Sequence, residues 1–153
     1  MAENLRIALA GNPNCGKTTL FNALTGTHQK TGNWTGVTVE KKEGVYRKDK
    51  SIKIVDLPGL YSLKAHGADE QAVIDYLSKT PPKVIINVVD GTNLERNLFL
   101  TTQLIALGIP LVIAVNMYDD LVKNGIILNV EKLSKLYNVS VVPISALKKT
   151  NVD

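Results

Sequence analysis

The segment Gly-Asn-Pro-Asn-Cys-Gly-Lys-Thr at residues 11–18 constrains the fold of this chain more than any other feature. An alternating apolar stretch (5–10) precedes it, and residues 19–24 carry apolar side chains at helical spacing. A strand, a glycine-rich loop and a helix in this order form the phosphate-binding loop of nucleoside triphosphatases. The glycines let backbone N–H groups wrap a phosphate, and the start of the helix favours an anion. The chain is therefore predicted to bind a nucleoside triphosphate.

Two side chains of this loop have expected roles in that chemistry. Lys17 can reach the β- and γ-phosphates, and the Thr18 hydroxyl can ligate Mg²⁺. The other nucleotide-binding residues predicted here are Asn12, Pro13, Asn14, Cys15, Gly16 and Thr19. A redox switch at Cys15 is one interpretation, and a simple need for a small side chain at that position is the favoured one.

Length and composition indicate one soluble domain. A chain of 153 residues can bury one sizeable core. The longest apolar runs, near 84–89 and 109–115, are much shorter than the 18 or more residues that a membrane span needs. The start of the chain has no signal-peptide pattern, and the lone Cys15 excludes an internal disulfide, which fits a reducing cytosol. Two histidines, His28 and His66, and one cysteine are too few ligands for a convincing metal cluster.

Strand and helix patterns alternate along the chain. The sequence predicts a hairpin from 37–46 and 51–55, strands at 84–89, 111–115 and 139–144, and helices around 72–77, 98–107 and 130–137. Residues 25–36 and 57–67 are predicted loops. The continuous β-branched runs are typical of strands buried on both faces of a parallel sheet. We predict a doubly wound α/β fold, with six mostly parallel strands, one of them antiparallel, and helices on both faces.

Two short motifs directly follow predicted strands, at the edge where such sheets bind ligands. In the first, residues 56–59, Asp56 can hold Mg²⁺ through water, and the Gly59 N–H can meet a γ-phosphate; Leu57 and Pro58 lie between them. In the second, residues 116–119, Asp119 can accept hydrogen bonds from two guanine donors that adenine lacks, with Asn116 and Met117 beside it.

A third short motif follows the last predicted strand. There the backbone N–H groups of Ser145, Ala146 and Leu147 can face the guanine carbonyl. Each motif alone is a weak indication, and the first is also a common turn. Together, in this order and each after a strand, they predict a Ras-like GTPase fold.

More specific segments resemble the G domain of FeoB, the bacterial and archaeal ferrous-iron transport protein. The matching residues are 11–18, 32–40, 56–63, 69–70 and 94–98, within a resemblance that covers 5 to about 148. The resemblance implies slow hydrolysis of GTP to GDP and phosphate, and a place at the cytoplasmic face of the inner membrane. It also implies linked helical and transmembrane domains and small accessory Feo proteins as partners, but no nucleic acid. Residues 1–153 are then one GTP-binding domain, a fragment of the longer protein.

The resemblance assigns further roles around the phosphates. Thr38, flanked by Gly36 and Val37, would contact Mg²⁺ and the γ-phosphate. Asn14 would coordinate a K⁺ ion, with backbone carbonyls near Gly32 and Trp34 completing the cage. The catalytic set would then be Lys17, Thr38, Asn14 and Gly59. For the Trp34 side chain, a mobile loop anchor and an effector contact both stay open.

Two positions depart from the general GTPase pattern. Leu60 stands where Ras-like enzymes place a glutamine that orients the attacking water, which an apolar side chain cannot do. Met117 replaces the usual lysine; its thioether can still cover the base, but a contact with the phosphate loop is lost, so nucleotide binding is expected to be weaker or less selective.

Charge leaves an alternative open. The chain has 18 basic and 14 acidic residues, and six of the basic ones gather between residues 41 and 53. Such a cluster suits RNA or an anionic membrane, although it more often marks the solvated face of an edge hairpin. A freestanding RNA- or ribosome-associated GTPase is the alternative function, and a P-loop phosphotransferase fits residues 116–119 less well.

Overall fold

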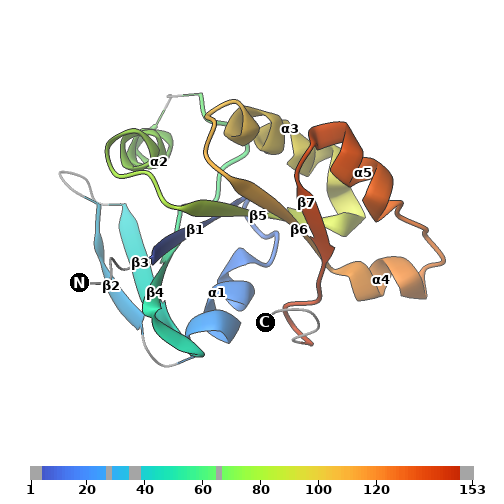
Figure 1. Cartoon of the computed structure of the whole chain (residues 1–153), viewed down its shortest axis with the longest axis horizontal. Coiled ribbons are helices and arrows are strands. Elements are labelled where there is room, and N and C mark those ends of the chain that lie inside the picture. The colour runs from blue at the N-terminus through green and yellow to red at the C-terminus, as the bar shows by residue number, and fades with distance from the viewer. Residues whose placement is uncertain (1–4, 27–28, 35–38, 65–66, 149–153) are drawn as a thin grey trace.

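The computed structural model describes residues 5–26, 29–34, 39–64 and 67–148, which form one sheet with helices on both faces (Figure 1). The strands are β1 (Leu5–Gly11), β2 (Gln29–Asn33), β3 (Glu40–Tyr46), β4 (Asp49–Asp56), β5 (Val84–Asp90), β6 (Leu111–Asn116) and β7 (Ser140–Pro143). The helices are α1 (Lys17–Thr25), α2 (Ala68–Lys79), α3 (Leu94–Ile105), α4 (Tyr118–Lys123) and α5 (Val130–Tyr137), and a 3₁₀ turn, Gly91–Asn93, precedes α3. Within these ranges no helix is both long and apolar enough to span a bilayer.

The sheet has the order β2-β3-β4-β1-β5-β6-β7. Strand β3 is antiparallel to both of its neighbours, and the pairs from β4 to β7 are all parallel. The predicted α/β class, the hairpin and the single antiparallel strand are confirmed. The predicted number of strands was one too low, because residues 25–36 were interpreted as a loop and the structure places β2 there. Every residue of β2 is exposed, so its sequence lacks the apolar alternation by which strands are recognised.

Two apolar clusters cover the two faces of the sheet. Neighbouring residues of β1 point to opposite sides: Ala8 joins the cluster that includes Val73 of α2 and Leu104 of α3, whereas Leu9 joins Phe21 of α1. Figure 1 shows the same division, with α2 and α3 above the sheet and α1 below it. Because both faces are covered, the central strands β1 and β5 are largely apolar.

The topology brings the motifs together. Strands β1, β4, β5 and β6 are parallel, so their carboxyl ends lie at one edge of the sheet. The glycine-rich loop leaves β1 at that edge, residues 56–59 follow β4, and residues 116–119 follow β6. Three segments that are distant in sequence therefore share one side of the molecule, as ligand sites in open α/β sheets do.

Candidate functional site

The glycine-rich loop turns sharply between β1 and α1. Gly16 caps α1 with φ 90°, and Asn14 also has a positive φ, of 65°. A Cβ atom at Gly16 would collide with Nδ2 of Asn116, so both the backbone angle and the space require glycine there. The Cys15 N–H donates to the Asn12 carbonyl at 3.3 Å and closes the turn.

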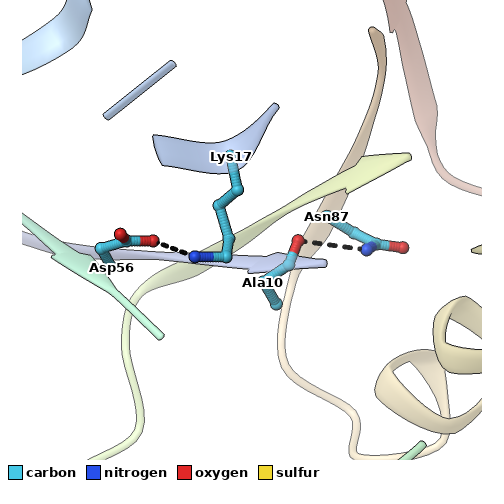
Figure 2. Close-up of polar contacts among 4 residues, drawn as sticks. All are labelled: Ala10, Lys17, Asp56 and Asn87. Carbon is cyan, nitrogen blue, oxygen red and sulfur yellow. Dashed lines mark hydrogen bonds and ion pairs between the residues drawn. The ribbon is translucent and has the colours of Figure 1, made fainter. Parts of the chain in front are cut away.

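Lys17 and Asp56 form a buried ion pair at the centre of this edge. The Lys17 ammonium, in the first turn of α1, donates to Oδ1 of Asp56, the last residue of β4 (Figure 2). Both residues are less than a tenth exposed. Two unpaired charges at this depth would cost far more than one neutral pair. The lysine predicted to hold phosphate is thus held by the carboxylate predicted to hold Mg²⁺.

A buried polar network fixes the start of the loop, and sequence reasoning missed it. Asn87 of β5 donates from Nδ2 to the Ala10 carbonyl at 3.3 Å (Figure 2), and its Oδ1 accepts from the Thr101 hydroxyl of α3. Asn97, one turn earlier on α3, accepts from the Asp90 N–H at 3.1 Å. The signal in the sequence was an asparagine inside the otherwise apolar run 84–89, because a buried amide needs partners.

Asn116 connects three of the predicted motifs. Its Nδ2 donates to the Cys15 carbonyl at 3.0 Å, and its Oδ1 accepts from the Ala146 N–H at 2.9 Å. Asn116 is 3% exposed, so these bonds are shielded from water. One side chain therefore holds the phosphate loop against the segment predicted to bind the guanine carbonyl.

Asp119, predicted to recognise the base, lies at the start of α4. Its carboxylate is 3.2 Å from Nζ of Lys148, and this hydrogen bond holds the pKa of the Asp119 carboxyl below its ordinary value. Met117, just before α4, has a positive φ of 59° and lines the hollow above the phosphate loop. Ser145 is buried and Leu147 is largely exposed. The carboxylate is thus ionised and accessible at neutral pH.

Two adjoining cavities of about 420 Å³ each flank Lys17 and Gly59, which line both of them. One is lined by Asp56, Leu57 and Pro58, and the other by Asn12, Pro13, Asn14, Gly16, Thr18 and Thr19. Their combined lining offers the Thr18 hydroxyl and the Asp56 carboxylate, which are oxygen ligands of the kind that Mg²⁺ prefers. Anywhere in the described ranges, this site included, no three His, Cys, Asp or Glu side chains gather as a metal cluster would need.

Gly59 and Leu60 are held close to the phosphate loop. A Cβ at Gly59 would lie 3.0 Å from Cα of Pro13, and the Leu60 N–H donates to the Gly11 carbonyl at 3.0 Å. The Leu60 side chain, 5% exposed, packs into the core beneath α2 and α3. It faces neither cavity, which agrees with the expectation that it positions no water.

Some predicted residues are not placed at the loop. Gly36, Val37 and Thr38 lie outside the described residues. Gly32 belongs to the edge strand β2, and the Trp34 ring packs on Tyr76 of α2 with centroids 5.2 Å apart. In this arrangement Gly32 and Trp34 do not line the cavity that Asn14 lines, so the K⁺ cage stays a prediction. Of the two interpretations of Trp34, the packing supports a loop anchor.

Cys15 is buried under the phosphate loop. It is 1% exposed and contacts the apolar cluster around Phe21. Burial raises the pKa of its thiol, and a neutral buried thiol is a poor nucleophile. The geometry supports the interpretation of Cys15 as a small packing residue.

Residues 5–153 match the family model described as ferrous iron transport protein B. The Fe(2+) transport protein A/Fe(2+) transporter FeoB fusion protein of Porphyromonas gingivalis is 50% identical over 141 residues, which is 91% of this chain and 17% of that protein. The Fe(2+) transporter FeoB of Escherichia coli K12 is 46% identical over 156 residues, 99% of this chain and 20% of that protein. The chain thus spans about a fifth of the length of these relatives.

Solved structures from S. thermophilus are also similar to this chain. A mutant NFeoB bound to GDP superimposes with a TM-score of 0.95 at 54% identity, over 97% of this chain and 59% of that one. NFeoB bound to GDP·AlF4⁻ and K⁺ has a TM-score of 0.86 at 55% identity, over 97% of this chain and 58% of that one. At these identities the similarity concerns sequence as well as fold.

Proposed function

The chain belongs to the ferrous iron transport protein B family, and we propose that it is the domain of such a transporter that binds GTP and hydrolyses it slowly. The observation that carries the proposal is the pair of hydrogen bonds made by Asn116. They join the phosphate loop to the segment that would meet the base, so both ends of one nucleotide have a preformed place. The FeoB structures that contain GDP support the same ligand.

The phosphates would be bound at the buried end of the site. Lys17 already points along the cavity wall toward Asp56, and a triphosphate would take over its positive charge. The carboxylate released in this exchange would, with the Thr18 hydroxyl, hold Mg²⁺. The metal supplies positive charge that neutralises the β- and γ-phosphates. Binding nucleotide and binding metal are therefore coupled through one ion pair.

Slow hydrolysis would follow from the position of Leu60, where Ras-like enzymes place the glutamine that orients the attacking water. The side chain of Leu60, which follows Gly59, is packed in the core, so it cannot orient a water molecule. We propose that Asn14, exposed in the hollow, holds a K⁺ ion, as the K⁺-bound relative suggests. A monovalent cation there supplies positive charge to the transition state.

We propose iron transport for a full-length protein of the size of these relatives, of which this chain would be one part. Linked helical and membrane domains, accessory Feo proteins and a position on the cytosolic face would fit the much greater length of the relatives. In this view the γ-phosphate orders residues 29–38 and 57–67, and hydrolysis releases them. The nucleotide state would then control the attached pore.

Phosphate release from GTP tests the enzymatic part of the proposal. The chain should turn GTP over slowly in K⁺ and more slowly still in Na⁺ at equal ionic strength. In Asn14→Ala the two rates should become equal, with GDP affinity changed only modestly. No GTP-dependent phosphate in either salt would contradict the proposed activity, and equal wild-type rates would contradict the K⁺ site alone.

A further inference from the structure

A third cavity, of about 390 Å³, lies away from the nucleotide hollow, between α2 and the β2–β3 edge of the sheet. Its lining includes Trp34, Tyr76, Arg6, Lys41, Lys79 and Asp75. None of these residues lines either cavity of the nucleotide site. The volume is in the range of cavities that bind small molecules.

Two of the lining residues carry buried polar atoms without partners. Trp34 and Tyr76 are 8% and 7% exposed and meet edge to face. Within the described ranges, neither Nε1 of Trp34 nor the Tyr76 hydroxyl has a hydrogen-bond partner. A buried polar group without a partner destabilises the folded state. The indole N–H can only donate, so the partner that it lacks is an acceptor.

The charges around the cavity favour an anion. Arg6 and Lys79 are exposed, and their side chains make no ion pair or hydrogen bond in the described part of the chain. Lys41 lies 5.0 Å from the centroid of the Trp34 ring and only loosely pairs with Glu43, at 3.9 Å. The one carboxylate of the lining, Asp75, already accepts from Gln71 at 2.8 Å. Three cations thus stand against two carboxylates, Asp75 in the lining and Glu43 beside Lys41, and the balance is one positive charge.

We propose that this cavity binds a small anion that carries a phosphate or carboxylate group. Arg6 and Lys79 neutralise the charge of that group. The Trp34 ring, whose Nε1 is sealed from solvent in this structure, turns so that Nε1 donates a hydrogen bond to one of its oxygens. Trp34 follows β2 directly and packs on α2, so a ligand held there stabilises the contact between this edge of the sheet and α2. This cavity shares no lining residue with the two nucleotide cavities, and the proposal does not rest on the proposed GTPase activity.

The single tryptophan makes the test direct, because the chain has only one indole N–H. The ¹⁵N-labelled chain, kept in excess GDP so that the phosphate loop is occupied, is titrated with inorganic phosphate or with succinate at constant ionic strength. The indole cross-peak should move saturably with at least one probe, and the probe that acts identifies phosphate or carboxylate as the preferred group.

Matched charge removals complete the test. Arg6→Gln combined with Lys79→Gln should weaken binding about tenfold, as expected for lost charge-assisted bonds. Lys135→Gln, an exposed charge on α5, should leave the titration unchanged. The proposal is overturned if the indole peak does not move with either probe, or if the double variant and the Lys135→Gln control bind alike.

Discussion

Lys17 and Asp56 form an ion pair that joins the first turn of α1 to the last residue of β4, 39 positions apart in sequence. Each residue also has a predicted role toward the nucleotide, one with phosphate and the other with Mg²⁺. In the structure each side chain neutralises the charge of the other. The site is therefore built so that neither charge is left alone before the ligand arrives.

Removing one partner should expose this dependence. Lys17→Met leaves Asp56 buried and unpaired, and we expect the free energy of unfolding without nucleotide to fall by about 3 kcal/mol. Lys17→Met with Asp56→Asn should recover most of that loss, since no charge then stays buried. Urea denaturation measures both changes. Asp56→Asn alone completes the comparison. If the double variant loses as much free energy of unfolding as the two single variants lose together, Lys17 and Asp56 are not coupled as described.

Placing a glutamine directly after Gly59, as in Ras-like enzymes, should not speed GTP hydrolysis. The Leu60 side chain packs in the core, so Leu60→Gln buries an amide and should lower the free energy of unfolding by about 1–3 kcal/mol without raising GTP turnover. Tyr61→Gln, next in the chain and 46% exposed, is the matched control and should lose less. A faster Leu60→Gln enzyme would mean that this side chain reaches the phosphates.

The ion pair of Asp119 gives a pH prediction with a definite sign. Lys148 lowers the pKa of Asp119, so its contribution to stability is present above the ordinary carboxyl pKa and is lost as the pH falls through the lowered value. Lys148→Ala should move the titration midpoint upward, toward the ordinary value of an aspartate carboxyl. Carboxyl ¹³C NMR of the nucleotide-free chain measures it, with Lys132→Ala as control. An unchanged midpoint would show that Lys148 does not set this pKa.

The γ-phosphate should change the packing of Trp34. Its ring rests on Tyr76 of α2, which follows residues 57–67, so ordering of that loop should alter the environment of the indole. Trp34 fluorescence should therefore differ between GDP and a non-hydrolysable GTP analogue, and amide exchange in residues 57–64 should slow with the analogue. The same emission and the same exchange with both ligands would mean binding without switching.

The sequence predicted those elements whose own residues carry a clear pattern. The glycine-rich loop, the buried strands β5 and β6 and the hairpin all have apolar periodicity or turn residues of their own. Strand β2 has neither, since its polar residues are held only by pairing with β3. Helix α4 is six residues long, too short to show a helical repeat.

Contacts between segments that are distant in sequence were harder to predict. The order of the motifs indicated that Asn116 and Asp119 belong to one site, but not that Asn116 holds both Cys15 and Ala146. The pairing of Asp119 with Lys148 depends on how β6 and β7 end side by side. Pairings of this kind follow from tertiary packing, which no local pattern specifies.

The base preference of the site tests the central claim most directly. Isothermal titration of the chain with GDP and with ADP, for wild type, Asp119→Ala and the neighbouring control Asp120→Ala, compares one carboxylate with another on α4. We predict that wild type binds GDP much more tightly than ADP and that Asp119→Ala weakens GDP binding by roughly tenfold or more. The affinity of Asp119→Ala for ADP should differ little from the weak wild-type value. Asp120→Ala should bind GDP almost as tightly as wild type. Equal affinity of the wild type for both nucleotides, or equal losses for both in Asp119→Ala, would contradict a guanine-nucleotide site.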